Sequence, residues 1–312
     1  MLILTLTINP SVDRNIEVDR LVFEDRAYIL SRSDSAGGRG MNASRVLHAF
    51  GAKTLAIVTS GGVNGPRLEK LAAKSGFPVK VVPIHNEIRV NLTITDKQGL
   101  AIRLNERGPQ ITQEELARLE KVVANRLDSA SWLMLCGSIP PGVSADFYTK
   151  LIRMARERKV KTLLDTDGDA LLHGTEACPS IVSPNQPEAE RLLNRALITR
   201  AQFLEAATRI KAMGAEAVML SLGGRGVVAV NENQLLEVIP PRTDAVSPLG
   251  AGDALAAAYV WAAAKRKDFA DCVRWAVAAG TASAMQPGLE LASLEQTKQV
   301  YKSVEVRQAG LM

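Results

Sequence analysis

The sequence predicts an α/β fold with three layers, in which helices cover both faces of a central, mainly parallel sheet. From Ser131 onward, short apolar runs alternate with helical stretches, a pattern typical of parallel strands joined by helices. Two earlier segments, residues 12–35 and 86–106, alternate apolar and polar residues and predict a small, half-exposed β-sheet. With 312 residues and 46% hydrophobic content, we expect a single domain over residues 1–312 that carries this small sheet as a lid.

The first strand is predicted over residues 2–8, which are apolar except for threonines and suit a strand buried on both faces. Residues 9–11, Asn-Pro-Ser, end this strand because proline breaks the ladder and favours a turn. Asp13 follows just beyond the strand end, where ligands of open α/β sheets bind. The alternative is that Asp13 is an ordinary turn aspartate.

The predicted lid contains two pairs of strands. Apolar and polar residues alternate around residues 16–18 and 28–30 in the first segment, and over 88–94 and 101–105 in the second. Residues 96–99, Asp-Lys-Gln-Gly, are a natural hairpin turn. Because ordinary βα units separate the two segments, we expect the small sheet to project from the main body and to close over a site.

A glycine-rich segment, Ala36 to Asn42, leads into a helical pattern that starts at Ala43 and ends at Gly51. Its Gly-x-Gly-x-x-Ala spacing satisfies a loose dinucleotide-binding fingerprint, but the acid expected about twenty residues later is missing from residues 58–60. The chain also has no Gly-Lys-Ser/Thr sequence, which excludes a Walker loop. Glycines that let a sugar approach the backbone fit better, and an NAD-binding oxidoreductase is disfavoured.

Beyond residue 130 the elements follow in a regular order. Strands are predicted at residues 132–136, 161–164, 180–183 and 217–220, with a hairpin at 227–230 and 235–239. Helices are predicted to begin near residues 144 and 186 and to cover about 200–213, 251–265 and 268–284. The loops at the carboxyl ends of these strands carry polar residues or glycines, and that rim is where such folds place their sites.

Residues 247–253, Ser-Pro-Leu-Gly-Ala-Gly-Asp, precede an alanine-rich helix. The small residues Gly250, Ala251 and Gly252 let backbone N–H groups converge at the helix N-terminus, which is a ready site for an anion. Asp253 lies in the first turn, where it could take a proton from a hydroxyl while these amides hold a phosphoryl group. The alternative is that Asp253 only caps its own helix.

Composition argues against several other classes. The net charge of +5 is modest and aromatic residues make up only 4%, which leaves few rings for stacking bases, so nucleic-acid binding is disfavoured. The three cysteines and three histidines are dispersed, which argues against a disulfide framework or a metal cluster. The longest apolar run, residues 254–264, is too short to span a bilayer, and no signal peptide is visible. We therefore expect a cytoplasmic protein with no membrane partner.

Together, these motifs resemble the ribokinase-type (PfkB) carbohydrate kinases over nearly the whole chain, which implies a ribokinase-like fold. The specific anchors are Gly37-Gly38-x-Gly40-x-Asn42 near the start and Gly250-Ala251-Gly252-Asp253 near the end. Three further features resemble the branch of phosphosugar kinases that act as phosphofructokinases or tagatose-6-phosphate kinases. They are Asn9-Pro10-x-x-Asp13, Arg89-x-Asn91 and Gly137-Ser138-x-Pro140-Pro141-Gly142-Val143.

The resemblance implies roles for residues on the sugar side. Asp253 would be the base that accepts the proton of the acceptor hydroxyl, and the amides of residues 250–252 would hold the migrating phosphoryl group. Asp13 would bind sugar hydroxyls through its two acceptor oxygens. The other substrate-binding residues are Gly37, Gly38 and Asn42 at the sugar ring, Ser138, Arg89 and Arg39 at the sugar phosphate, and Asn91 on the lid.

On the nucleotide side, the resemblance implies that Asn185 and Glu188 order Mg²⁺ through water, because they match the family's Asn-x-x-Glu. The alternative for this pair is a helix cap. ATP is expected to lie against Ser221, Gly223, Gly224 and Gly226, with Thr281 near the adenine pocket. The sequence departs from the family at Ser183, where a lysine is common, and at Pro248, where Ser or Thr is usual; both bear on nucleotide contacts, and the second on any monovalent-cation site.

The activity that the resemblance implies is ATP-dependent phosphorylation of a ketohexose phosphate, giving a sugar bisphosphate and ADP. Fructose-1-phosphate, fructose-6-phosphate and tagatose-6-phosphate are the candidate acceptors, and lid closure would keep water from competing with them. Because an uncovered apolar lid face is a liability, we also expect a homodimer formed through the lid. The alternatives are a kinase of an unphosphorylated sugar or nucleoside, and a catalytically silent sugar-phosphate sensor.

Overall fold

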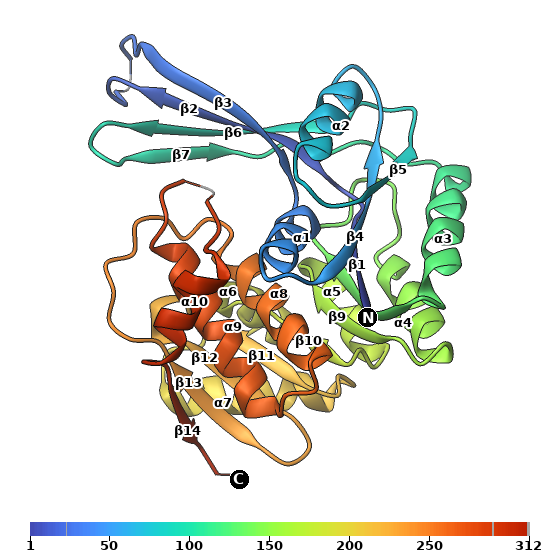
Figure 1. Ribbon diagram of the computed structural model, residues 1–312, viewed down its shortest axis with the longest axis vertical. Coiled ribbons are helices and arrows are strands. Elements are labelled where there is room, and N and C mark those ends of the chain that lie inside the picture. The colour runs from blue at the N-terminus through green and yellow to red at the C-terminus, as the bar shows by residue number, and fades with distance from the viewer. Residues whose placement is uncertain (23, 289, 311–312) are drawn as a thin grey trace.

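A computed structural model describes residues 1–22, 24–288 and 290–310. Its main element is a ten-stranded sheet with the order β14-β13-β12-β11-β10-β9-β8-β1-β4-β5 (Figure 1). Neighbouring strands from β11 to β5 pair in parallel, whereas β12, β13 and β14 form an antiparallel edge, which confirms the predicted mainly parallel sheet. The strands are β1 (Leu2–Thr7), β4 (Lys53–Ser60), β5 (Val79–Pro83), β8 (Ala130–Cys136), β9 (Lys161–Asp165), β10 (Ile181–Val182), β11 (Val218–Ser221), β12 (Val227–Val230), β13 (Leu235–Ile239) and β14 (Glu305–Gln308).

Helices cover both faces of this sheet, as the sequence predicted. One buried cluster joins the sheet to α2 through α7, and a second joins its other face to α1, α8, α9 and α10. The helices are α1 (Arg39–Ala49), α2 (Gly65–Ala73), α3 (Gln113–Leu127), α4 (Phe147–Glu157), α5 (Gly168–Glu176), α6 (Gln186–Leu193), α7 (Arg200–Ala212), α8 (Ala251–Ala264), α9 (Phe269–Ala284) and α10 (Leu294–Tyr301). Helix α1 begins at Arg39 rather than at the predicted Ala43, because the turn at Gly38 already starts it.

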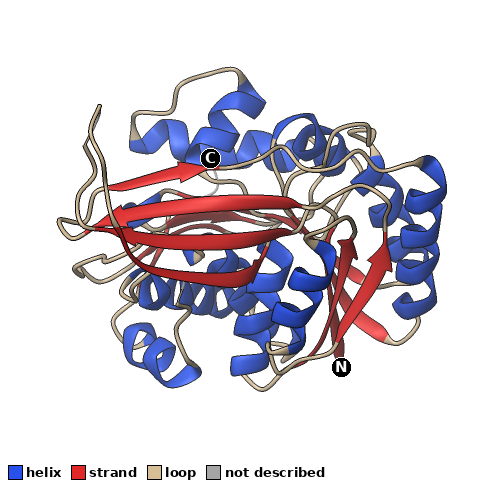
Figure 2. Cartoon of the chain, turned by 90° about the horizontal axis from the view of Figure 1, so that it is seen from above, coloured by secondary structure: helices blue, strands red, loops and turns tan. Residues whose placement is uncertain are grey.

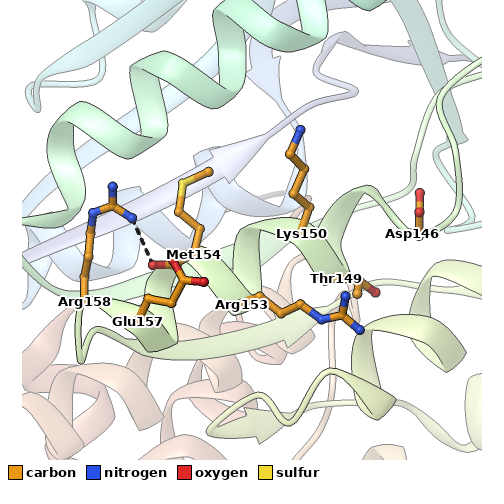
Figure 3. A pocket seen from close by; sticks show the side chains of 7 residues that line it. All are labelled: Asp146, Thr149, Lys150, Arg153, Met154, Glu157 and Arg158. Atoms are coloured by element: carbon orange, nitrogen blue, oxygen red, sulfur yellow. Dashed lines mark hydrogen bonds between the residues drawn. The ribbon is translucent and has the colours of Figure 1, made fainter.

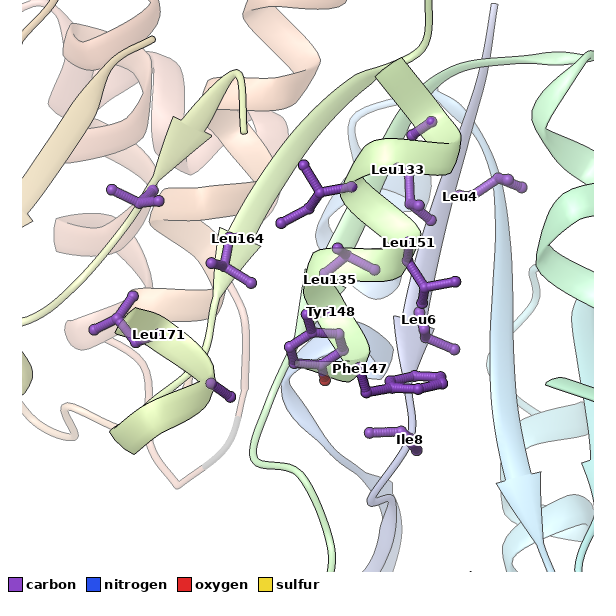
Figure 4. Packing of buried hydrophobic residues seen from close by; sticks show 14 of the residues in the cluster. Leu4, Leu6, Ile8, Leu133, Leu135, Phe147, Tyr148, Leu151, Leu164 and Leu171 are labelled. Carbon is purple, nitrogen blue, oxygen red and sulfur yellow. The ribbon is translucent and has the colours of Figure 1, made fainter. Parts of the chain in front are cut away.

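Strand β1 lies between β8 and β4 and is buried on both faces. Leu4 and Leu6 belong to the cluster that includes α4 (Figure 4), and Ile3 belongs to the cluster on the other face. Removing a fully buried leucine side chain typically costs about 2–5 kcal/mol of stability. This core therefore fixes the strand whose carboxyl end leads into Asn9 and Asp13.

A separate four-stranded sheet with the order β3-β2-β6-β7, here called the small sheet, projects from the domain (Figures 1 and 2). Its strands are β2 (Ser11–Val18), β3 (Ile29–Gly37), β6 (Arg89–Asp96) and β7 (Ala101–Leu104). They come from the two alternating segments of the sequence. The predicted turn between β6 and β7 is present, with the N–H of Gly99 donating to the Asp96 carbonyl at 3.1 Å.

The two faces of the small sheet differ in chemistry. Residues that pair across neighbouring strands share a face. Asp13 pairs with Asn91 on one face, whereas Ile16, Ile94 and Ile102 align on the other. Ile102 is 39% exposed to solvent. One face of the small sheet therefore carries candidate site residues, and the other is an exposed apolar surface.

None of the helices within residues 1–22, 24–288 and 290–310 is long and apolar enough to cross a membrane. Over the same part of the chain, no group of three or more His, Cys, Asp or Glu side chains is arranged to hold a metal ion. Cys136 and Cys272 are buried free thiols, and Cys178 is a half-buried one.

Candidate active site

The candidate site lies where the carboxyl ends of β1, β8 and β9 approach the N-terminal ends of α1 and α8. Hydrogen bonds between side chains that are far apart in sequence mark this place: Asn9 to Ser138, Arg39 to Asp165 and Asn42 to Asp253. The site is therefore on the rim that an open α/β sheet uses for ligands.

Asp253 is positioned by the start of α8 and by a partner from α1. Gly250 precedes this helix with φ of 73°, a left-handed conformation that glycine adopts without strain, and no side chain caps the helix. The Asp253 carboxylate is 9% exposed and accepts a hydrogen bond of 2.7 Å from Asn42 Nδ2. Asp253 therefore turns toward α1 and is not occupied in capping its own helix.

The acid limb of the pH–rate profile is expected to report Asp253. Burial and the Asp165 carboxylate raise the pKa of Asp253 to about 7, although the Asn42 hydrogen bond and the Arg39 guanidinium act to lower it. Because a base has to be ionised to accept a proton, kcat/KM should fall about tenfold for each pH unit below about 7 and level off above it. Initial rates measured across pH check this expectation, and a profile that stays flat below neutral pH contradicts it.

Asp13 is held on the small sheet by a short hydrogen-bond network. Its Oδ1 accepts from Ser11 Oγ at 2.6 Å and from Asn91 Nδ2 at 3.1 Å. Burial raises the pKa of Asp13, although these two hydrogen bonds act to lower it. Oδ2 makes no such contact among the described residues, so this carboxylate can accept hydrogen bonds from a ligand's hydroxyl groups.

Gly37→Ala is expected to weaken substrate binding much more than folding. A Cβ at Gly37 would lie 2.2 Å from Asp13 Cγ, so the carboxylate would have to leave its place beside Ser11 and Asn91. We expect KM for the acceptor to rise about tenfold or more, the effect of losing one charged hydrogen bond. Steady-state kinetics and a thermal melt measure the two effects, and an unchanged acceptor KM would refute the assignment of Asp13.

Arg39 lies in a cluster of carboxylates. Its Nη1 donates to Asp165 Oδ1 at 2.8 Å, and its Nη2 donates to Asp167 Oδ2 at 3.0 Å and to Glu188 Oε1 at 3.2 Å. Burial acts to lower the pKa of Arg39, but the surrounding carboxylates outweigh it and raise that pKa. The resemblance implied that Arg39 binds the sugar phosphate, whereas in this structure its donors are engaged by acids.

Asp165 and Asp167 are site residues that were missing from the sequence-based assignment. Asp165 ends β9, and Asp167 precedes α5. Their position at the carboxyl end of a parallel strand was the available signal, because ligands bind at that edge. The sequence pattern did not reveal the partner of these two aspartates, because Arg39 lies far earlier in the chain, at the start of α1.

Arg89 lies at the start of β6, at the base of the small sheet. Its Nη2 donates to the Asn9 carbonyl at 2.9 Å and its Nη1 to the Glu106 carbonyl at 3.0 Å. Burial lowers the pKa of Arg89, although the carboxylate of Asp13 opposes this. Nε is buried and has no hydrogen-bond partner among the described residues, which is costly for a charged donor.

A cavity of about 680 Å³ opens beside the N-terminus of α8. This volume is within the range of pockets that hold small molecules and cofactors. The cavity brings together all the residues that the sequence assigned to the nucleotide: Asn185, Ser221, Gly223, Gly224, Gly226 and Thr281. Ala251 and Gly252 line it as well, so the amides before Asp253 border this cavity.

Asn185 and Glu188 form the capping box of α6. The Glu188 N–H donates to Asn185 Oδ1 at 2.9 Å, and the Asn185 N–H donates to Glu188 Oε2 at 2.9 Å. Burial raises the pKa of Glu188, and the Arg39 guanidinium acts to lower it. The helix-cap alternative is therefore present in the structure, and any metal-binding role has to coexist with it.

A second hollow lies along α4 and contains none of the predicted site residues (Figure 3). Its walls mix both signs of charge, for example Lys150 and Arg153 with Glu157. Arg158 at its end donates to the Met154 carbonyl at 3.2 Å. Its lining residues include no glycine and no strand residue, so this hollow lacks the features of a phosphate or sugar site.

The chain matches the model of the pfkB family carbohydrate kinases over residues 7–296. It therefore belongs to this family. It is 31% identical over 302 residues to the ATP-dependent 6-phosphofructokinase isozyme 2 of Escherichia coli (strain K12), covering 96% of this chain and 97% of that relative.

Two further comparisons agree with this family assignment. The chain is 28% identical over 304 residues to a 1-phosphofructokinase of Vibrio cholerae serotype O1, covering 97% of this chain and 96% of the relative. The crystal structure of the phosphofructokinase-2 from Escherichia coli in complex with fructose-6-phosphate matches with a TM-score of 0.88 and 30% identity, covering 96% of this chain and 98% of that one. The ribokinase-like fold is therefore confirmed.

Proposed function

We propose that this protein transfers the terminal phosphoryl group of ATP to a hydroxyl of a ketohexose phosphate, giving a sugar bisphosphate and ADP. The observation that carries this proposal is the position of Asp253. Its carboxylate is held by Asn42, next to the amides of Ala251 and Gly252 that border the cavity, and it is close enough to Asp13 for the two carboxylates to affect each other.

The chemistry follows from that position. Asp253 takes the proton of the acceptor hydroxyl while the oxygen of that hydroxyl bonds to the terminal phosphorus of ATP. The bond from that phosphorus to the oxygen bridging it to ADP then breaks, and ADP leaves with the electron pair. The amides of Ala251 and Gly252 stabilise the charge that builds up on the phosphoryl oxygens.

The phosphate group of the sugar is assigned to the place beside Asn9 where Arg89 and Ser138 lie. The unpartnered Nε of Arg89 would gain an acceptor there, and a guanidinium pairs with two phosphate oxygens at once. Ser138 Oγ accepts from Asn9 Nδ2 at 3.2 Å, which leaves its O–H to donate. Asp13 would bind the hydroxyls of the sugar.

Mg²⁺ would be held through water by Asn185 and Glu188. Their oxygen atoms suit a hard cation that keeps several waters. Each of these oxygens has two lone pairs, so accepting one N–H in the capping box leaves room for a water ligand. When bound, the ion would neutralise charge on the phosphates of ATP. A monovalent cation also stays a prediction.

The proposal is tested by measuring ADP release with fructose-1-phosphate, fructose-6-phosphate, tagatose-6-phosphate and their unphosphorylated parents. We expect kcat/KM for at least one phosphorylated sugar to exceed that of its parent by about 100-fold or more, because the parent leaves Arg89 without its anion. Equal activity on a parent sugar or nucleoside would favour the first alternative, and binding without turnover would favour a sensor.

We propose that the apolar face of the small sheet binds a second copy of this chain. Large exposed apolar side chains gather on this sheet and its turns: Tyr28 63%, Ile29 62%, Leu30 48%, Leu100 57%, Ile102 39% and Leu104 52% exposed. Monomeric soluble proteins rarely leave such a patch uncovered. A copy of the same sheet offers a matching apolar surface, as expected for a twofold interface.

Ile102→Glu combined with Leu104→Glu is expected to convert the dimer into a monomer. Two buried carboxylates in an apolar interface carry a large desolvation cost that no partner offsets. Light scattering should then report one chain mass of 33.5 kDa instead of about twice that value. Arg103→Glu, on the opposite face of the same strand, should remain dimeric; a wild-type protein that is already monomeric would refute the proposal.

A further inference from the structure

Arg45 is a half-buried arginine next to Asn42, the hydrogen-bond partner of Asp253. It lies on α1, one turn after Asn42, and its Nη1 donates to Asn42 Oδ1 at 2.7 Å. Its Nη2 donates to the carbonyl of Ala36, at the end of β3 just before Gly37. Neither contact is needed to hold α1 together, since both run from a side chain to groups at the site.

The chemistry of arginine fixes the orientation of the Asn42 amide. A guanidinium has only donors, so the atom of Asn42 that faces Arg45 has to be the oxygen. The NH₂ group then faces the other way, where it donates to Asp253 Oδ2 at 2.7 Å. Without Arg45, the amide could turn over and present its oxygen to Asp253.

We propose that Arg45 is a positioning residue for phosphoryl transfer. Arg45 keeps the Asn42 amide donating to Asp253, and this hydrogen bond holds Asp253 ionised with one oxygen open to the acceptor hydroxyl. This inference rests on the proposed function. An amide that donates favours the carboxylate, whereas an amide oxygen at the same place would favour the protonated acid, which cannot act as a base.

Other charged and titratable groups also face Asp253, and the test has to separate Arg45 from them. They are Asp165 at the end of β9, Arg39 on α1, Asp13 on β2 and the Cys136 thiol on β8. Burial lowers the pKa of Arg45, whereas the carboxylates of Asp13 and Asp253 act to raise it. Arg45 therefore acts on Asp253 through its charge as well as through Asn42.

The experiment is a double-mutant cycle with Arg45→Met and Asn42→Ala, read in kcat, in KM for both substrates and in the pH profile. Arg45→Met should lower kcat by about 10- to 100-fold, which is the usual loss when a residue that orients a site side chain is replaced. It should also move the acid limb of the pH profile to higher pH. In the Asn42→Ala background, the same substitution should change kcat by less than about threefold, because the amide it orients is gone and only the direct effect of the Arg45 charge on Asp253 remains.

Arg45→Lys and Arg274→Met are the matched variants. Arg45→Lys keeps a charged donor and should restore part of the kcat lost in Arg45→Met. If Arg45→Met does not fold, Arg45→Lys takes its place in the cycle. Arg274 lies on α9, away from the site, and donates to the carbonyl of Lys302 at the end of α10; its loss should leave kcat and the acid limb unchanged. The proposal is overturned if the kcat losses of Arg45→Met and Asn42→Ala simply multiply in the double variant. It is also overturned if Arg45→Met does not move the acid limb of the pH profile.

The cycle compares variants with an active wild-type enzyme on its best acceptor. If the wild-type chain turns over none of the sugar phosphates, the proposed function fails and the role of Arg45 fails with it. If the wild-type chain is active and the cycle is additive, only the role of Arg45 fails.

Discussion

Asp253→Asn is expected to lower kcat by about 100- to 10,000-fold, which is the contribution of a positioned general base. Asparagine has the same shape, and its carbonyl can still accept the hydrogen bond from Asn42 Nδ2. It cannot take up the proton of the acceptor, because an amide is not basic near neutral pH. ADP release under saturating ATP and acceptor measures the loss.

Binding distinguishes a lost base from a damaged site. Calorimetry should show that Asp253→Asn binds ATP and the sugar phosphate within about threefold of the wild-type affinities, since the interactions removed act in the transition state. Asp13→Asn is the matched carboxylate variant and should instead raise KM for the acceptor. An Asp253→Asn enzyme that keeps more than about a tenth of wild-type kcat contradicts the assignment of the base.

Arg89→Ala is expected to raise KM for the sugar phosphate by about 100-fold or more. Two charged hydrogen bonds to a phosphate, each worth about 1.5 kcal/mol, correspond to a change of this size in affinity. KM for ATP should stay within about twofold, because Arg89 lies at the base of the small sheet and does not line the cavity proposed to hold ATP. Steady-state kinetics with each substrate varied in turn make the measurement.

The controls separate phosphate recognition from damage to the small sheet. Arg103→Ala removes an exposed arginine from the same face of that sheet and should change KM for the sugar phosphate by less than about threefold. Activity on the unphosphorylated parent should be equally low in the wild-type protein and in Arg89→Ala. If Arg89→Ala lowers the activity on the sugar phosphate and on its parent to the same degree, Arg89 supports the fold and does not bind the phosphate.

The elements that the sequence predicted best have strong local signals at both ends. Strands β12 and β13 have the predicted bounds, because Gly226 precedes them and a turn at residues 231–234 separates them. Helix α9 begins directly after its predicted start at Asp268, which caps it by accepting from the Asp271 N–H. Strand β14 was missed because Val306 is its only apolar residue, so its pairing with β13 leaves no periodic pattern.

The same distinction applies to the site. Glycine-rich turns and strand ends are local features, and they led to Asp13 and Asp253, whereas the residues that line the cavity beside α8 were assigned from the family resemblance. Pairings across the sheet are not local. The carboxylates around Arg39 come from β9, from the residue before α5 and from α6, so no spacing in the sequence shows that they meet one guanidinium.

This difference has a physical consequence for Arg39. An arginine that neutralises several buried carboxylates lowers the cost of keeping them close together. If Arg39 also reached a sugar phosphate, it would have to leave these acids, and their repulsion would oppose the move. We therefore propose that the cluster around Arg39 holds the shape of the site and that Arg89 is the principal phosphate ligand.

A crystal structure with ADP, aluminium fluoride and the sugar phosphate that gives the highest kcat/KM would test the proposed role of Asp253 most directly. Aluminium fluoride stands in for the transferring phosphoryl group. We predict that its fluorines contact the amides of Ala251 and Gly252, and that the acceptor hydroxyl lies about 2.6–3.2 Å from an Asp253 oxygen. An acceptor hydroxyl bound by another base, with Asp253 paired to Asn42 alone, would contradict the account.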